Sequence, residues 1–243
     1  MYLNYILTRL SNQTGFVFNS VLVAKNKIPK MKKIRIAIQK SGRLNEDSLQ
    51  ILKDCGISID NGKDQLKASS RNFPLEVFYL RNGDIPQYLR DGVVDIAIIG
   101  ENVLIEKGED ISIAEKLGFS KCKVSLAVPK SVKYKSVKDF EGKRIATSYP
   151  NKNYLDSKGV KADLHIINGS VEIAPNIGLA DAICDIVSSG STLFKNNLKE
   201  VEVMLTSEAV LAVSPQISQE RTVLLEDLRF RIQSVLRARQ SKY

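Results

Sequence analysis

The chain has 243 residues with a formal net charge of +9, and 43% of its residues are hydrophobic. This length suffices for one large or two small domains with real cores, and no segment has the roughly 18 unbroken apolar residues of a membrane helix. The three scattered cysteines, Cys55, Cys122 and Cys184, fit a reducing cytosol better than a disulfide framework. We therefore expect a cytoplasmic protein without a membrane partner.

The charge pattern and the single histidine narrow the chemistry further. Basic residues do not form a stripe interleaved with aromatic ones, so we expect no nucleic-acid partner, and the positive charge instead suits a nucleotide or phosphate ligand. His165 is the only histidine, and we interpret it as an ordinary strand residue. A Ser-His-Asp triad is not indicated because no nucleophile motif accompanies that histidine.

Residues 1–30 differ in composition from the rest of the chain, because they carry four basic residues and no acid. The composition resembles a transit peptide, or else reflects an upstream start codon. We favour the second interpretation, in which the working protein begins at Met31. Residues 1–30 are then a basic extension that is disordered or not native.

From Met31 onward, strand patterns alternate with helix patterns. We predict strands at residues 33–39, 75–81, 93–100, 123–130, 144–148, 162–169 and 181–187, and one long or two short strands at 200–214. We predict helices at residues 44–57, 84–92, 101–108, 170–179, 191–197 and 220–243. Such alternation predicts an α/β fold with mostly parallel sheets.

A similar unit occurs once in each half of the chain. "LRDGVVDIAIIGENVL" at residues 89–104 and "IGLADAICDIVSSGSTL" at 177–193 each have an aspartate opening a buried strand, a polar turn and a helix. Two similar lobes with a cleft between them would produce this repetition. Coincidence among α/β units is the alternative.

The turn at residues 188–192 reads SSGST and lies between a strand and a helix. Free backbone N–H groups, four hydroxyls and Gly190 make such a turn suitable for a phosphate monoester, whereas the plainer interpretation is a Ser/Thr helix cap. Asp181 and Asp185 lie four residues apart on the strand, so we expect both on one side, with Asp185 near ribose hydroxyls. Together these features predict a phosphoribosyl pocket.

Two further strand-to-helix turns carry polar residues, and a third site lies at a strand end. Residues 40–43 read KSGR, which suits a triphosphate or pyrophosphate, although a solvated basic turn fits equally well. In "NGSVE" at 168–172, Ser170 is a plausible N-cap residue followed by Glu172. Glu101 and Asn102 follow a buried strand, which places them at the expected cleft.

The residues now carry a specific resemblance. The blocks "IAIQKSGRL", "DGVVDIAIIGENVL", "GKRIATSYP", "NGSVEIAP", "GLADAICDIVSSGSTL" and "RIQSVLRARQSKY" resemble the ATP phosphoribosyltransferase family, in its longer form, over residues 31–243. Two blocks depart from the family pattern: SSGST stands for the usual STGAT, and RNGDIP at 81–86 stands for RDDDIP. Asn82 and Gly83 thus replace two acids, which puts any acidic role of those positions in doubt.

The resemblance implies the first step of histidine biosynthesis: N1 of ATP attacks C1 of phosphoribosyl pyrophosphate (PRPP), and pyrophosphate leaves, with Mg²⁺ carried by the substrate and no protein metal site assigned. It implies that Asp185, Lys40 and Arg43 act in catalysis. It assigns PRPP to Asp181, Ala182, Asp185, Ser188, Ser189, Gly190, Ser191, Thr192, Gly169, Ser170 and Glu172. It assigns ATP to Lys40, Ser41, Gly42, Arg43, Glu101 and Asn102. A homo-oligomer is also expected.

The resemblance further implies two lobes like those of type II periplasmic binding proteins. We expect residues 31–119 and 204–243 in lobe I, and 120–203 with the phosphate loop in lobe II. The family's long form continues into a histidine-binding regulatory domain, so we interpret the end at Tyr243 as a truncation and expect no histidine feedback through that domain. Two rival interpretations are a non-catalytic binding module of the same fold and a catalytically inactive relative.

Overall fold

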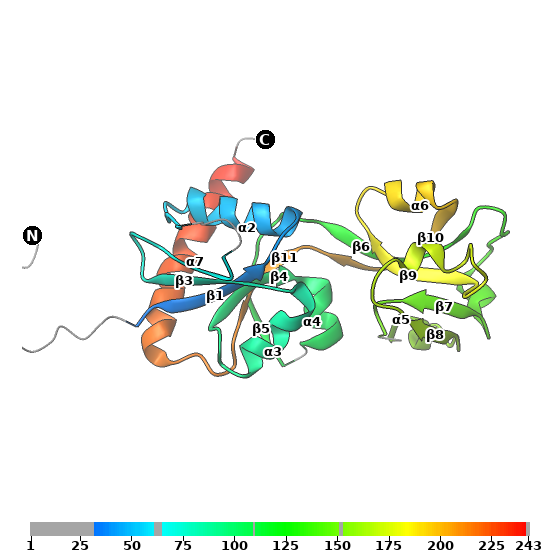
Figure 1. Ribbon diagram of the computed structural model, residues 1–243, viewed down its shortest axis with the longest axis horizontal. Coiled ribbons are helices and arrows are strands. Elements are labelled where there is room, and N and C mark those ends of the chain that lie inside the picture. The colour runs from blue at the N-terminus through cyan, green and yellow to red at the C-terminus, as the bar shows by residue number, and fades with distance from the viewer. Residues whose placement is uncertain (1–31, 61–64, 109, 151–152, 242–243) are drawn as a thin grey trace, which may run out of the picture. The chain divides into compact units, whose positions relative to one another are not determined.

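The computed structural model describes residues 32–60, 65–108, 110–150 and 153–241. The expectation for residues 1–30 therefore lies outside the described residues. The described chain forms two β-sheets, each flanked by helices (Figure 1). We call the part built on the six-stranded sheet the first lobe and the part built on the five-stranded sheet the second lobe.

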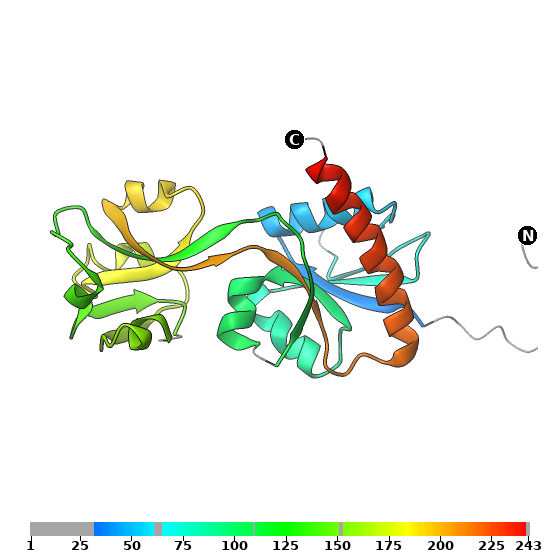
Figure 2. The ribbon, with the colours of Figure 1, turned by 180° about the vertical axis from the view of Figure 1, so that it is seen from behind.

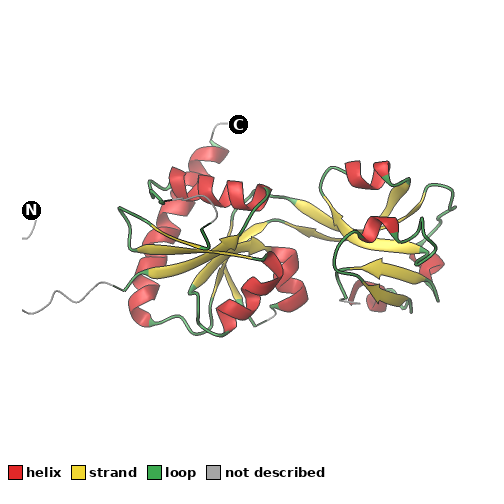
Figure 3. Ribbon diagram, in the orientation of Figure 1, coloured by secondary structure: helices red, strands yellow, loops and turns green. Residues whose placement is uncertain are grey.

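The first lobe has strand order β2-β3-β1-β4-β11-β5. Its strands are β1 (Ile34–Gln39), β2 (Lys67–Ser69), β3 (Leu75–Leu80), β4 (Ile96–Gly100), β5 (Ser112–Lys116) and β11 (Ala209–Val213). Its helices are α2 (Arg43–Asp54), α3 (Ile85–Arg90), α4 (Glu101–Lys107) and α7 (Gln219–Gln240), with a 3-10 turn η1 (Asn82–Asp84). Helices lie on both faces of this sheet (Figure 3).

Successive side chains of the first sheet belong alternately to two hydrophobic clusters. Ile34, Ile36 and Ile38 of β1 pack with buried residues of α2 and α7, whereas Ala37 joins a second cluster with residues of α3 and α4. In α2, apolar residues recur at helical spacing, and the chain turns at Gly56, whose φ is +75°. The buried face of α2 thus fixes the helix directly after the turn at residues 40–42.

The second lobe has strand order β10-β6-β9-β7-β8. Its strands are β6 (Cys122–Pro129), β7 (Arg144–Thr147), β8 (Asp163–Ile166), β9 (Ala182–Val187) and β10 (Leu198–Ser207). Its helices are α5 (Asn153–Ser157) and α6 (Ser191–Lys195), with 3-10 turns η2 (Val137–Phe140) and η3 (Val171–Ile173). His165 lies in β8, as expected from the sequence.

Both sheets are mixed, so the expectation of mostly parallel sheets is wrong. β1 pairs in parallel with β3 and β4, and β7 pairs in parallel with β8 and β9. The other pairs are antiparallel: β2 with β3, β6 with β9 and β10, and β11 with β4 and β5.

The two passages of the chain between the lobes lie side by side (Figure 2). Ser207, the last residue of β10, pairs with Cys122, the first residue of β6. β10 remains in the second sheet through Ser207, whereas the sequence placed the return to the first lobe at about residue 204. The predicted strand at 200–214 is accordingly two strands, which belong to different sheets.

The sequence did not reveal β5, and the predicted helix at 170–179 is largely absent. β5 is an edge strand whose side chains are mostly exposed, so it lacks the apolar pattern that marks a strand. In place of the expected helix, the chain forms only the three-residue turn η3. Pro175 contributes to this because its ring restricts the residue before it and removes an N–H donor.

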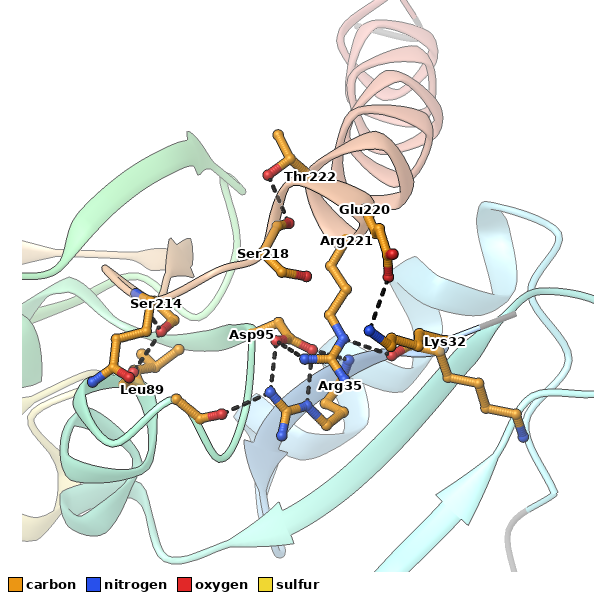
Figure 4. Close-up of polar contacts among 12 residues, drawn as sticks. Lys32, Arg35, Leu89, Asp95, Ser214, Ser218, Glu220, Arg221 and Thr222 are labelled. Carbon is orange, nitrogen blue, oxygen red and sulfur yellow. Dashed lines mark hydrogen bonds and ion pairs between the residues drawn. The ribbon is translucent and has the colours of Figure 1, made fainter. Parts of the chain in front are cut away.

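A buried aspartate fastens α7 to the first sheet (Figure 4). The Asp95 side chain is 2% exposed, and its Oδ1 lies 2.8 Å from the Arg35 guanidinium and 3.1 Å from that of Arg221. Arg35 comes from β1, and Arg221 lies in the first turn of α7. One carboxylate therefore joins the start of the C-terminal helix to two elements of the sheet.

Candidate active site

The loop at residues 188–192 follows β9 and leads into α6. Gly190 is the residue before α6 and has φ +72°, a left-handed conformation that favours glycine. No side chain caps the start of α6, and the Ser189 and Ser191 hydroxyls lie 3.0 Å from each other. The loop therefore presents backbone N–H groups and hydroxyls without a capping side chain, which favours an anion-binding turn over the plain cap.

The loop forms one wall of a cavity of about 170 Å³, here called the loop cavity. Its lining consists of residues 185–193 and Glu172. Asp185 is partly buried, and burial, with a further contribution from the nearby Glu172 charge, raises the pKa of its carboxyl group. A carboxylate thus faces the same space as the four hydroxyls, as the sequence predicted for a sugar phosphate.

Asp181 and Ala182, by contrast, lie away from this cavity. Asp181 precedes β9, whereas the loop follows it, so the length of the strand separates them. The Asp181 carboxylate accepts a hydrogen bond from Arg144 N at 2.9 Å, and Asp181 and Ala182 line a different cavity. The expectation that both residues bind PRPP is not supported, because a spacing of four residues sets the face but spans most of a strand.

The turn before η3 contributes less than the sequence predicted. Gly169 and Ser170 are exposed and do not line the loop cavity. Glu172 does line it, although it lies 13 residues before Asp185 in the chain. Of this turn, the structure therefore brings only the carboxylate to the loop.

A larger cavity of about 450 Å³, here called the lysine cavity, adjoins the loop at Val187 and Ser188. Three of its lining residues are lysines: Lys116, Lys121 and Lys123. Lys116 Nζ lies 3.0 Å from Glu101 Oε1, and Lys123 Nζ lies 2.9 Å from Glu200 Oε1. The predicted residue Glu101 lies in this cation-rich space, which suits a polyphosphate.

A third cavity of about 370 Å³, here called the amide cavity, is lined by residues of both lobes. Gln39, Arg43, Asn82 and Asn102 come from the first lobe, and Ser188 from the second. Lys40, Ser41 and Gly42 are exposed and do not line it. Gly42 has φ +88° and precedes α2, and Arg43 and Leu44 at the start of that helix line the cavity.

A hydrogen-bonded chain links the lobes beside these cavities. Asn102 is buried; its Nδ2 donates to the Tyr149 hydroxyl at 3.3 Å, and its Oδ1 accepts from the Ser207 hydroxyl at 3.0 Å. Burial, with a further contribution from the Asp185 charge, raises the pKa of Tyr149. Tyr149 is therefore a neutral phenol close to the carboxylate of the loop cavity.

The sequence did not predict a place at the site for the three lysines, for Asn82 or for the side chain of Tyr149. Lys121 and Lys123 lie at the start of β6, and Lys116 ends β5, so the crossing of the chain between lobes gathers them. "KLGFSKCK" at residues 116–123 does contain a lysine cluster at that point. This cluster is the feature of the sequence from which a cation-rich cavity could have been predicted.

Two chemistries have no support among the described residues. No group of three or more histidine, cysteine, aspartate or glutamate side chains is placed there to hold a metal ion. Burial raises the pKa of Cys184 to about 12 and also raises that of Cys122, so neither thiol is an ionised nucleophile at neutral pH. In the same residues, no helix combines the length and apolarity needed to cross a bilayer.

The fold and the site define a two-lobed α/β protein with a polar, glycine-containing loop at the end of a strand. Solved structures agree: a substrate-binding protein of an amino acid ABC transporter shares this fold, with a TM-score of 0.56 at 14% identity over 84% of this chain and 93% of that one. The protein titled "Tv2483 bound to L-arginine" has a TM-score of 0.58 at 14% identity, over 87% of this chain and 86% of that one. The binding-protein-like fold is thus confirmed.

Sequence comparisons give the family. The HisG family, ATP phosphoribosyltransferase, matches residues 81–234. The ATP phosphoribosyltransferase of Cytophaga hutchinsonii is 54% identical over 212 residues, which are 86% of this chain and 74% of that one, and that of Parabacteroides distasonis is 51% identical over 86% and 75%. The chain belongs to the HisG family of ATP phosphoribosyltransferases, which confirms the resemblance seen in the sequence.

A solved member of the family also has this fold. The ATP phosphoribosyl transferase (HisG:HisZ) complex from Thermotoga maritima contains a chain with a TM-score of 0.68 and 32% identity. The match covers 83% of this chain and 99% of that one. Both lobes are therefore shared with that relative.

Proposed function

We propose that this chain transfers the phosphoribosyl group of PRPP to N1 of ATP, releasing pyrophosphate and N1-(5-phosphoribosyl)-ATP, the first step of histidine biosynthesis. The observation that carries the proposal is the place of Ser188, which lines the loop cavity, the lysine cavity and the amide cavity together. Donor phosphate, leaving group and nucleotide then have adjoining sites. Family membership supports the same reaction.

The loop cavity is the proposed site of the phosphoribosyl group. Backbone N–H groups and hydroxyls of residues 188–192 would hold the 5-phosphate, as short polar turns hold anions elsewhere. Asp185 and Glu172 face the same cavity and would accept hydrogen bonds from ribose hydroxyls. The negative charge of Asp185 would also favour the positive charge that develops on the sugar ring.

The lysine cavity is the proposed site of the pyrophosphate, which leaves with the electrons of the bond to C1. Lys116, Lys121 and Lys123 would balance its charge, once Lys116 and Lys123 exchange their carboxylate partners for phosphate oxygens. Mg²⁺ would enter as part of the PRPP or ATP complex, because the described residues form no cluster of ligands for it. Arg43 would contact the triphosphate of ATP from the amide cavity.

This reaction requires no covalent nucleophile from the protein. The adenine N1 lone pair forms the bond to C1 as the bond from C1 to the pyrophosphate oxygen breaks. The adenine gains a positive charge, which is relieved by loss of an N6 proton to solvent. Positioning and charge stabilisation are therefore the protein's contributions, in agreement with neutral cysteine thiols and with a single histidine in β8.

The proposal is tested by mixing the purified chain with ATP, PRPP and Mg²⁺ and measuring pyrophosphate release with and without ATP. We expect ATP-dependent release together with the absorbance of an N1-substituted adenine. Asp185→Asn should lower kcat/KM about a hundredfold or more. Asp181→Asn is the matched control, because Asp181 lies before the same strand and pairs with Arg144, and it should retain activity.

A binding module of the same fold is the competing function. It would bind PRPP or ATP in calorimetry without releasing pyrophosphate when both are present. An inactive relative would behave in the same way. ATP-dependent release by the wild-type chain overturns both alternatives, and its absence overturns the transferase.

The setting of the reaction is also proposed. We place the enzyme in the cytoplasm, where ATP and PRPP are available, without a nucleic-acid or membrane partner. We further propose a homo-oligomer; the Thermotoga maritima relative, solved as a HisG:HisZ complex, supports assembly with other chains in general. Light scattering of the purified chain would give a single-chain mass if the oligomer is wrong.

A further inference from the structure

The side-chain oxygen of Asn82 is a buried acceptor without a partner. Within the described part of the chain, Asn82 Oδ1 is shielded from solvent and receives no hydrogen bond. Asn82 begins η1, directly after β3, and its side chain lines the amide cavity. Folded proteins leave few buried polar atoms unsatisfied, so such an atom in a residue that lines a cavity calls for a donor that the protein itself does not supply.

We propose that Asn82 Oδ1 accepts a hydrogen bond from the exocyclic N6 amino group of adenine, which makes Asn82 the residue that selects the base. The inference rests on the proposed function, because it assigns the nucleobase of the proposed substrate to the amide cavity. It goes further by naming the atom that distinguishes an adenine nucleotide from other purine nucleotides.

The other two amide side chains of the cavity are engaged by the protein. Gln39 Nε2 donates to Ser41 O at 2.7 Å. Asn102 donates to Tyr149 and accepts from Ser207. Among the residues that line this cavity, Asn82 is the one whose side-chain oxygen is buried and still receives no hydrogen bond within the described part of the chain.

The rest of the lining suits a nucleotide. Leu44 and Ile186 provide apolar contact for the faces of a base, and Arg43 and Lys121 provide charge for its phosphates. Ser188 connects this cavity to the loop cavity, so a base held at Asn82 would lie in a space continuous with the proposed donor site. The nucleophile and the ribose donor would then be neighbours.

The chemistry strengthens the proposed contact during the reaction. When N1 forms its bond to C1, the positive charge spreads over N1 and N6, and the N6 protons become more acidic. A hydrogen bond from N6 to Oδ1 is therefore stronger in the transition state than in the ground state, which is the condition for acceleration. A 6-oxo purine would instead place a second acceptor against Oδ1 and would carry a proton on N1.

The experiment measures base discrimination by calorimetry, with ATP and with purine ribonucleoside triphosphate, in which hydrogen replaces the 6-amino group. We expect the wild-type chain to bind ATP about tenfold more tightly than this analogue. Asn82→Ala should bind both ligands alike, with about a tenfold loss for ATP. Asn82→Asp keeps an acceptor at the same position and should retain the preference.

The control variant is Asn72→Ala. The Asn72 side chain makes its hydrogen bonds with Ser58, Ser70 and Gly56. It does not line the amide cavity, so its loss should leave discrimination unchanged. A wild-type chain that binds ATP and the analogue equally overturns the proposal without any variant. An Asn82→Ala variant that keeps the wild-type preference also overturns it.

The pyrophosphate assay on the same wild-type sample separates this proposal from the proposed function. Release that depends on ATP, together with unchanged discrimination in Asn82→Ala, overturns the role of Asn82 and leaves the transferase intact. No release, together with discrimination that disappears in Asn82→Ala, supports the base contact and overturns the transferase.

Discussion

At the scale of the residue, Asp185 shows how burial and function conflict. Its carboxylate lies in the loop cavity, and burial raises its pKa, so the ionised form is disfavoured by its surroundings. A ribose hydroxyl and a positively charged transition state would both favour that ionised form. In the proposed function, this charge would contribute to binding and catalysis while it lowers the stability of the free protein.

This conflict predicts the pH dependence of stability. Because the folded pKa of Asp185 lies above its unfolded value, the cost of its charge is present above the folded pKa and is relieved as pH falls through it. Asp185→Asn should therefore melt at a higher temperature than the wild type at pH 8, and the gap should narrow as pH falls toward 4. Thermal unfolding followed by circular dichroism measures this, and an equal gap at both pH values would contradict it.

Activity should follow the same group in the opposite sense. The role proposed for Asp185 requires its ionised form, so acidification should reduce kcat/KM at a pH above the ordinary aspartate pKa of about 3.9. The pH profile of pyrophosphate release gives this value. A profile that falls only near or below that ordinary pKa would show that Asp185 is not the controlling group.

Charge in the phosphate loop gives a second prediction at this scale. Ser189→Asp would place a carboxylate among the groups that are proposed to hold the 5-phosphate, so PRPP affinity should fall on the order of a hundredfold or more. Ser234→Asp makes the same change in net charge on the exposed face of α7 and should leave affinity unchanged. Calorimetry with PRPP compares the two, and equal affinities would contradict the loop assignment.

At the scale of the element, α7 depends on the buried carboxylate of Asp95. Asp95→Ala would leave Arg35 and Arg221 without their shared partner, so the free energy of unfolding should fall by about 3 kcal/mol. Asp227→Ala removes an exposed pair with Arg231 on the same helix and should cost about 0.5 kcal/mol or less. Urea unfolding measures both variants, and equal losses would show that burial does not set the strength of the Asp95 contacts.

Helices and strands were predictable where their apolar residues recur with a regular period and form the side that packs against the core. β1, β4 and β9 are short apolar runs, and α2 carries its apolar residues on one side, so the turns that follow the strands could be placed. β5 was not predictable, because its contacts lie at a sheet edge and its side chains are largely exposed. The mixed pairing was also hidden, because periodicity marks a strand without giving the direction of its neighbours.

The candidate site was predictable only within single turns. The loop at 188–192 and Asp185 are neighbours in the sequence and share a cavity. Lys116, Tyr149 and Asn82 come from distant parts of the chain and reach their cavities through tertiary packing, which no local pattern records. Asp181 was expected beside the loop at 188–192, but it lies at the opposite end of β9. Two residues can face the same side of a strand and still lie at different ends of it.

At the scale of the whole molecule, the hydrogen bond between Asn102 and Tyr149 joins the two lobes. Tyr149→Phe removes it and should raise the KM for the substrates on the order of fivefold, because the arrangement of both lobes around them loses one support. Tyr154→Phe is the matched control, since its hydroxyl bonds Glu202 within the second lobe. Steady-state kinetics distinguishes them, and equal KM values for the two variants would contradict the role of the interlobe bond.

The part of the chain that carries the site forms one compact unit. Residues from Lys32 onward form this unit, and every candidate site residue lies in it. A chain of residues 31–243 should therefore release pyrophosphate at the rate of the full chain. Parallel assays and melting curves check this, and a large loss of either activity or melting temperature would show that residues 1–30 contribute to the unit.

The position of β11 between β4 and β5 has a consequence for synthesis of the protein on the ribosome. The first sheet lacks an interior strand until residues 209–213 have been made, whereas the second sheet has all its strands by Ser207. The lobe that begins first in the sequence is thus the last to be completed. Until then, β4 and β5 have unpaired edges. The nascent chain therefore passes through a stage in which chaperones that bind unpaired strand edges could bind it.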